Sequence, residues 1–478
     1  MSETRERTPW PWVAAAVLVP AVLLYATASR YGYHRDELYF RMLPLKWGYV
    51  DQPFLTPLLA KASVAAFGDT VSGLRVLAPV FLGAGIVIAA LTVRELGGRP
   101  RAQALGAWAY AFASIPLLSG HYLVTATIDL TLWAAALLAI TRALLRDPRW
   151  WLGAGAVVGV AADNKLLVSI LVIGVLAGLL IAGPRSVLVS RWLLTGAAVA
   201  VVIALPTLIY QATHGWPQLG MAGALHDDNA SDVRAQLLPF QVLMIGPPMF
   251  PLVVMGFVAL WRRPEWRPLR ALTIAYLVAL AINFVGGGQI YYAFGLLAYL
   301  MAAGWATGRG PRWLLVTAIA VNALVSAYIV LPVLPLRDTK VQASVNQTLG
   351  DQVGWPTYVA TVRRVVATLT PQERARAVIF TGNYGEAGAI SRFGRDLPPV
   401  YSGHNDLYYE GPPPASRDVV IVWTEGSDYR TRFTDCGRAV RVDNHVGVDN
   451  EEQGGQVAVC HLPASGWSVL WPRLQHYS

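Results

Sequence analysis

Two adjacent carboxylates, Asp36 and Glu37, follow the first long apolar run of this 478-residue chain. The segment 34–41 around them also holds Arg35 and Arg41. A short carboxylate beside an arginine stays ionised near neutral pH, so it can accept the proton of an incoming hydroxyl or amine. The pair therefore predicts a general base in a wet cleft. A solvated loop, in which the arginines simply balance the carboxylates, is the competing interpretation.

Three other ionisable residues could take part in the same chemistry. Asp129 lies inside one, where a carboxylate usually faces a cavity or a partner, although neighbouring hydroxyls could satisfy it. Asp51 stands just before Pro53, so it either caps the helix that this proline opens or binds substrate. Lys165 is the only cation in the apolar stretch 151–183. It could bind a lipid phosphate as a point charge or merely extend to the membrane surface.

The remaining candidates lie on the predicted outer side of the membrane. Arg75 precedes the second apolar run and is placed like Lys165. No pair of histidines has metal-ligand spacing, so a divalent metal is possible but not favoured, and the sequence identifies no certain cofactor. The glycines at 286–288 do not form a nucleotide loop, because they follow an apolar helix and lack a Gly-Lys-Ser/Thr ending.

The composition is that of a membrane protein. Hydrophobic residues make up 55% of the chain and charged residues only 14%, whereas soluble proteins carry about a quarter. Apolar runs that each predict a helix across the bilayer recur eleven times, at 10–28, 77–93, 102–118, 122–141, 151–162, 166–183, 192–210, 238–261, 270–285, 289–307 and 312–332.

Charge predicts the orientation of these helices. If the N-terminus is cytoplasmic, the inner segments hold sixteen arginines against five carboxylates, which accounts for the net charge of +9. This basic balance therefore says nothing about nucleic acid. We divide 151–183 into two spans, because one helix of that length would measure about 50 Å against a core of about 30 Å. With eleven spans, the C-terminal part lies outside the cell.

Residues 336–478 change in character and predict a small extracytoplasmic α/β domain. Strands are expected at 377–380 and 419–423, with an amphipathic helix over 358–369. The only cysteines, Cys436 and Cys460, would pair in an oxidising compartment and would be small core residues in a reducing one. Cleavage of the first run as a signal peptide, after 26–28, is an alternative that its length disfavours.

Together these segments resemble the bacterial glycosyltransferase family 39 proteins, GT-C relatives of the protein O-mannosyltransferases and of the lipid A aminoarabinose transferase. The resemblance covers nearly the whole chain, and its most specific part is the Asp36-Glu37 motif. The matching stretches are Tyr33–Tyr39, Trp47–Pro53, Gly73–Arg75, Arg94–Gly98, Asn164–Lys165, His214–Pro217, Tyr291–Tyr292, Asn383–Ile390 and Pro398–Asn405.

The resemblance implies a GT-C fold, with a transmembrane domain over 1–335 and an extracytoplasmic domain over 336–478. It also implies juxtamembrane helices in the first outer loop, 30–76, and a polyprenyl-phosphate sugar donor. Transfer would invert the anomeric carbon, with Asp36 as base and Asp129 as the carboxylate of the fourth span. Two departures from the family pattern are Phe54 in place of a second proline and Gln289 where many relatives have a lysine.

We therefore expect an integral-membrane glycosyltransferase that acts on an envelope lipid, polysaccharide or protein at the outer face. Glu37 and Asp129 would position acceptor and sugar, while Lys165, Arg75 and Arg35 would stabilise the departing phosphate. A lipid transporter or scramblase, and a non-catalytic binding subunit, are the alternatives. The substrate-binding candidates are His34, Arg35, Asp51, Arg75, His121, Lys165, His214, Gln289, Tyr291 and Tyr292.

Overall fold

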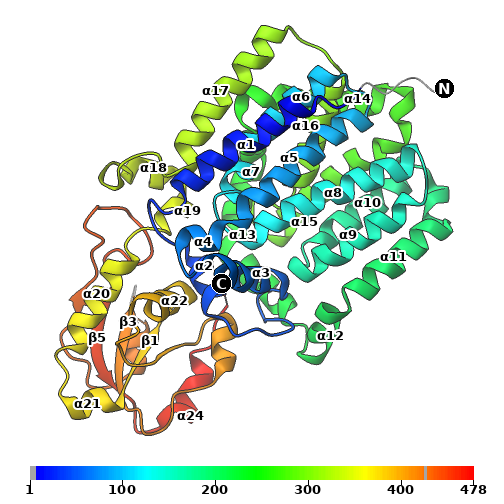
Figure 1. The fold of residues 1–478 in the computed structure, drawn as a ribbon. Helices are drawn as coiled ribbons and strands as arrows, with labels where there is room; N and C mark the ends of the chain where they lie inside the picture. Colours follow the sequence, from blue (N-terminus) through cyan, green and yellow to red (C-terminus); the bar gives the residue numbers. More distant parts are fainter. Residues whose placement is uncertain (1–6, 425–427, 478) are drawn as a thin grey trace. The chain divides into compact units, whose positions relative to one another are not determined.

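The structure, a computed structural model, describes residues 7–424 and 428–477 (Figure 1). The chain divides into two compact units. The first unit comprises residues 1–26, 46–59 and 75–331. The second comprises residues 27–45, 60–74 and 332–478.

The first unit is a bundle of helices (Figure 1). All eleven runs predicted to be spans are helical. The helices are α1 (Trp10–Thr27), α5 (Leu77–Glu95), α6 (Pro100–Ala111), α7 (Ser114–Ser119), α8 (Thr125–Leu145), α9 (Trp150–Asn164), α10 (Val168–Ile181), α11 (Arg191–Ile203), α12 (Leu205–Thr213), α13 (Pro217–Ile245), α14 (Phe250–Arg262), α15 (Arg270–Gly286), α16 (Phe294–Ala306) and α17 (Arg312–Val330), and short 3₁₀ turns lie at 185–189, 247–249 and 264–269.

Fewer of these helices than predicted could each cross a bilayer unaided. Within the described residues, five are long and apolar enough, or up to seven if each of two bent pairs counts as one span. The bends are 61° between α11 and α12 and 80° between α13 and α14. The stretch 151–183 forms two helices as predicted, since the chain breaks at Lys165 between α9 and α10.

Small residues let the helices of this bundle pack closely. A Cβ atom on Gly256 of α14 would lie 1.9 Å from the carbonyl oxygen of Leu300 on α16. A Cβ atom on Gly155 of α9 would lie 1.9 Å from the carbonyl oxygen of Gly196 on α11. Without a hydrophobic drive between helices in lipid, such close backbone approach is a main source of association. These glycines therefore fix the helix pairs.

Arginines predicted to lie on the cytoplasmic side gather at one end of the bundle. Arg142 and Arg146 near the end of α8 both pair with Glu95 at the end of α5, the former at 3.3 Å. At the same helix, Arg94 donates to Thr8 before α1 at 3.3 Å. These contacts link the end of α5 to the end of α8 and to the segment before α1.

The second unit is built on a five-stranded sheet in the order β2-β1-β3-β5-β4. β1 pairs in parallel with β2 and β3, whereas β5 is antiparallel to β3 and β4. The strands are β1 (Ala377–Thr381), β2 (Val400–Ser402), β3 (Val419–Thr424), β4 (Val440–Arg441) and β5 (Gln456–His461). Its helices are α18 (Lys340–Val345), α19 (Gln347–Gly350), α20 (Trp355–Val366), α21 (Pro371–Arg376), α22 (Tyr384–Phe393), α23 (Asp428–Arg432) and α24 (Gly466–Leu470), with 3₁₀ turns at 336–338, 405–410 and 471–473.

The secondary structure predicted for the tail is present. Both expected strands are present, and the expected helix is α20, which begins three residues earlier behind the left-handed Gly354. Cys436 and Cys460 form a disulfide. Because Cys460 is buried in the core that Phe380 and Trp471 share, the disulfide ties the loop before β4 to the sheet.

The segment 30–76, predicted to be the first outer loop, contains three helices: α2 (Arg35–Met42), α3 (Leu55–Phe67) and α4 (Val71–Arg75). However, residues 27–45 and 60–74 belong to the second unit, whereas the sequence assigned this loop to the first. The physical reason is the apolar face of α2, which is buried against α22. A Cβ atom on Gly388 of α22 would lie 2.7 Å from the backbone of Leu38.

Candidate functional site

A reciprocal cap starts α2 and fixes two of the predicted site residues. The backbone N–H of His34, the N-cap, donates to Glu37 Oε2 at 2.8 Å. The backbone N–H of Asp36 donates to His34 Nδ1 at 3.2 Å. The side chain of Glu37 is therefore turned back onto the helix start, and the residue is 0% exposed.

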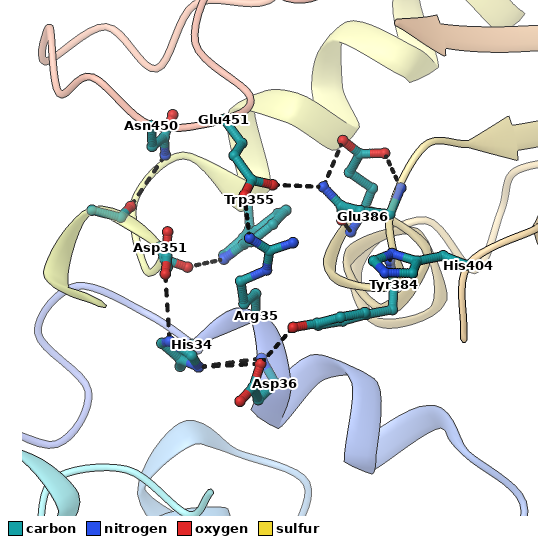
Figure 2. Close-up of polar contacts among 12 residues, drawn as sticks. His34, Arg35, Asp36, Asp351, Trp355, Tyr384, Glu386, His404, Asn450 and Glu451 are labelled. Atoms are coloured by element: carbon teal, nitrogen blue, oxygen red, sulfur yellow. Dashed lines mark hydrogen bonds and ion pairs between the residues drawn. The ribbon is translucent and has the colours of Figure 1, made fainter. Parts of the chain in front are cut away.

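Asp36 points the other way and is reachable from solvent. Its side chain is 30% exposed, and its Oδ1 accepts a hydrogen bond of 2.8 Å from the hydroxyl of Tyr384 (Figure 2). Among the described residues, none donates to Oδ2. The first turn of a helix stabilises negative charge, so this position suits a carboxylate that keeps one oxygen available as a proton acceptor.

Tyr384 is held between Asp36 and Arg35. The Arg35 guanidinium carbon lies 5.0 Å from the centre of the Tyr384 ring, and its Nη1 pairs with Glu451 at 2.5 Å (Figure 2). Burial, followed by the charge of Asp36, raises the pKa of Tyr384 well above its usual value. The phenol therefore stays protonated and can only donate to Asp36, while Arg35 is neutralised by Glu451 rather than by Asp36.

His34 completes this group from the opposite side. Its Nε2 lies 3.6 Å from Asp351 Oδ2, and its Nδ1 lies 3.9 Å from Asp36 Oδ1. Burial disfavours the charged imidazole, but Asp36 and Asp351 outweigh it and raise the pKa of His34. We name the set His34, Arg35, Asp36, Asp351, Tyr384 and Glu451 the Asp36 cluster.

A second cluster forms in the first unit around Lys165. The Lys165 Nζ lies 4.6 Å from the ring centre of Tyr292 and 5.7 Å from that of Tyr291, and its charge interacts with Asp129. Asp129 Oδ1 is buried without a hydrogen-bond partner in the described structure. The preceding residue, Asn164, positions Lys165: it accepts from Thr56 at 2.6 Å and donates to the carbonyl of Thr125 at 3.0 Å.

A third group joins Arg75 and His121. Arg75 lies with its guanidinium carbon 5.0 Å from the ring centre of Tyr122, which is itself 5.0 Å from the imidazole of His121. Both ring nitrogens of His121 are buried without a hydrogen-bond partner within the described residues. Burial and the neighbouring Arg75 lower the pKa of His121 well below its usual value, so this imidazole is neutral.

The chain is similar to known proteins over different lengths. Residues 51–210 match the family described as dolichyl-phosphate-mannose-protein mannosyltransferase. The structure is similar to that of ArnT from Cupriavidus metallidurans in the apo state, with a TM-score of 0.63 and 12% identity over 94% of this chain and 98% of that chain. The fold is that of the GT-C glycosyltransferases.

Two other solved structures extend this GT-C likeness. ArnT from Cupriavidus metallidurans bound to undecaprenyl phosphate gives a TM-score of 0.63 at 13% identity, over 96% of this chain and 99% of that chain. The mycobacterial arabinofuranosyltransferase AftD gives 0.51 at 15% identity, over 95% of this chain and 42% of that chain. None of the curated proteins matches the sequence. The predicted resemblance and fold class are confirmed.

Within this GT-C fold, the predicted site residues separate into the two units. His34, Arg35, Asp36 and Glu37 lie in the second unit, and all other candidates lie in the first. Of these, three do not join the clusters described above. Asp51 is half-buried in the loop before α3; His214 is exposed and stacks on Tyr210 at 4.1 Å; and the carbonyl of Gln289 accepts from Asn283 at 2.8 Å.

The prediction omitted three members of the Asp36 cluster, Asp351, Tyr384 and Glu451. Tyr384 lies in a stretch that carried the family resemblance, Asn383–Ile390, and that signal could have suggested it. Asp351 and Glu451 stand in polar loops, where no local pattern distinguishes them from other carboxylates. In residues 7–424 and 428–477, no group of three His, Cys, Asp or Glu side chains is arranged to hold a metal ion.

Proposed function

We propose that this chain is an integral-membrane glycosyltransferase that uses a polyprenyl-phosphate sugar and acts at the outer face of the membrane. In the reaction, the acceptor oxygen attacks the anomeric carbon and gives its proton to Asp36. The bond from this carbon to the phosphate oxygen breaks, and polyprenyl phosphate leaves as an anion. The product carries the sugar with inverted configuration.

The observation that carries this proposal is the surroundings of the Asp36 carboxylate. One oxygen is oriented by Tyr384, a donor that stays protonated, while the other has no donor among the described residues. Arg35 is paired with Glu451, so it does not neutralise the carboxylate. A base needs this combination of fixed position, negative charge and an open acceptor site. Glu37, capped and buried, supports the helix instead.

The donor would be bound by the residues of the first unit. Lys165 supplies a compact positive charge for the phosphate, and Arg75 a second one. Asp129, a buried carboxylate whose charge interacts with that of Lys165, can accept a hydrogen bond from a sugar hydroxyl. The GT-C relative ArnT, solved with undecaprenyl phosphate, supports a lipid-phosphate donor for this chain. Because Arg35 is occupied by Glu451, we assign it no phosphate contact.

A deletion strain tests the proposed function directly. We expect one envelope glycan, glycolipid or glycoprotein to lose a single sugar, with accumulation of the unused polyprenyl-phosphate sugar. Lipid and glycan profiling by mass spectrometry would detect both, and the wild-type gene should reverse them. A strain whose envelope sugars and polyprenyl lipids match the parent would contradict the proposal.

The orientation is tested by single cysteines at Ser416 and Glu265, which are both exposed. We expect an impermeant maleimide to label Ser416→Cys but not Glu265→Cys on intact cells, because the tail is extracytoplasmic and the arginine-rich end is cytoplasmic. The native Cys436–Cys460 disulfide can stay in place, since it has no free thiol. Labelling of the Glu265 position alone would show that the topology is the reverse of the one proposed.

A further inference from the structure

A groove in the first unit lies outside the three clusters described above. It is lined by α6 and α17, with Pro9 and Trp12 at the start of α1 completing the lining (Figure 1). We call it the α6–α17 groove. Its volume is about 720 Å³, whereas small-molecule sites measure about 300–1,000 Å³. The lining follows one face of each helix and includes Arg101, Trp108 and Phe112 along α6 and Arg312, Val316 and Ala323 along α17.

The α6–α17 groove is charged at one end and apolar along the rest. Arg101 and Arg312 stand in the first turns of α6 and α17, and the lining beyond them consists of apolar and aromatic side chains as far as Phe112 and Ala323. At 1.5 Å per residue, each wall is about 16 Å long, or about half of a hydrocarbon core of about 30 Å. The groove therefore has the length of one leaflet of a bilayer.

The two arginines of the groove are not neutralised by the described part of the protein. Both are exposed, and neither makes a hydrogen bond, ion pair or ring contact with another described residue. Among the described lining residues, none is acidic. Arg142 and Arg270 differ, since the first pairs with Glu95 at 3.3 Å and the second donates to the carbonyl of Trp261 at 2.6 Å. The charged end of the groove is thus open to an anion.

Exposed tryptophans flank the charged end of the groove. Trp12, in the lining, is 65% exposed, and Trp313, directly after Arg312, is 70% exposed. Tryptophan gathers at the level of the lipid headgroups, where its ring is apolar and its N–H is wet. These side chains therefore indicate that Arg101 and Arg312 lie at headgroup level and that the apolar part of the groove lies at the level of the acyl chains.

We propose that the α6–α17 groove binds an anionic phospholipid, with its phosphate on Arg101 and Arg312 and one acyl chain along the two helices. Guanidinium groups pair well with phosphate, and basic pockets between membrane helices bind anionic headgroups. A zwitterionic lipid carries its own cation and gains less from the arginines. A soluble anion would leave the apolar length of the groove unfilled. The inference depends neither on the proposed transfer reaction nor on which side of the membrane this end faces.

The test measures lipid binding and not transfer. The purified full-length protein would be titrated with dioleoylphosphatidylglycerol or with dioleoylphosphatidylcholine, which share their acyl chains and differ in headgroup charge. Native mass spectrometry would count the lipids that each protein molecule retains. We expect the wild type to bind the anionic lipid about tenfold to thirtyfold more tightly, which is the effect of two arginines near a membrane surface.

Paired charge variants separate this groove from the general charge of the protein. The double variant Arg101→Gln, Arg312→Gln should bind the two lipids with affinities within about threefold of each other. The control Arg262→Gln, Arg267→Gln removes the same charge from two exposed arginines outside the groove and should keep the wild-type preference. The melting temperature should be unchanged in both, because none of the four side chains contacts a partner in the described residues.

A second pair of variants tests the shape of the groove without changing its charge. Ala320→Trp, at an exposed lining position of α17, should fill the groove and abolish the preference for the anionic lipid. Thr317→Trp places the same side chain at an exposed position of α17 outside the groove and should bind as the wild type does.

Three results would overturn the inference. One is equal affinity of the wild type for the two lipids. Another is the same loss of preference in both arginine double variants, which would assign the effect to net charge rather than to the groove. The third is displacement of phosphatidylglycerol from the wild type by a lower concentration of undecaprenyl phosphate, with no displacement in Ala320→Trp, which would make the groove a polyprenyl-phosphate site.

Discussion

Asp36→Asn is expected to retain the fold and to lose transfer. The amide is nearly isosteric and still accepts the hydrogen bond from Tyr384 through its oxygen, but it cannot take the acceptor proton. Loss of a general base typically costs about 10²–10⁴-fold in rate. The measurement is single-turnover transfer from a radiolabelled polyprenyl-phosphate sugar, with variant and wild type at matched amounts.

Two further variants make this measurement decisive. Asp338→Asn removes an exposed carboxylate of the same unit and should leave the rate unchanged. Tyr384→Phe leaves the base in place and removes only its 2.8 Å hydrogen bond, so it should slow transfer less than Asp36→Asn does. If Asp36→Asn turned over within tenfold of the wild type, the base would have to be another residue.

Lys165→Ala is expected to weaken donor binding far more than acceptor binding. A charge-assisted contact to phosphate contributes about 1.5–3 kcal/mol, or roughly 10- to 150-fold in affinity. The position of Lys165 supports this effect, since its ammonium group lies 4.6 Å from the ring centre of Tyr292 and its neighbour Asn164 is fixed by two hydrogen bonds. Titration of the purified protein with undecaprenyl phosphate measures it.

A purely structural lysine would give a different pattern. Lys165 also packs between two tyrosines, so its loss could lower the melting temperature without changing affinity. Lys165→Arg should recover part of the binding, because a point contact depends more on charge than on shape. Lys340→Ala, at an exposed lysine, serves as the control. Equal affinities for wild type and Lys165→Ala would remove the phosphate role.

The helices of the first unit could be predicted from the sequence because their signals are local. Each apolar run forms a helix because of its own composition. The stretch 151–183 breaks at its one cation, Lys165. The number of helices that could each cross the bilayer unaided was harder to predict from the sequence. Runs such as 192–210 and 238–261 have enough apolar residues to cross a bilayer, yet they bend where proline or glycine interrupts the helix, and composition alone does not register a bend.

The sequence by itself determined the membrane character, the α/β tail, the arginine-rich end and the candidate base. Only the tertiary structure decided what surrounds that base. Tyr384 reaches Asp36 across 348 residues of chain, and Arg35 reaches Glu451 across 416. Such contacts follow from how α2 packs on α22, and no periodicity or spacing in either segment encodes them. The same packing turned Glu37 inward as a cap, so two adjacent carboxylates that look alike in sequence have different surroundings.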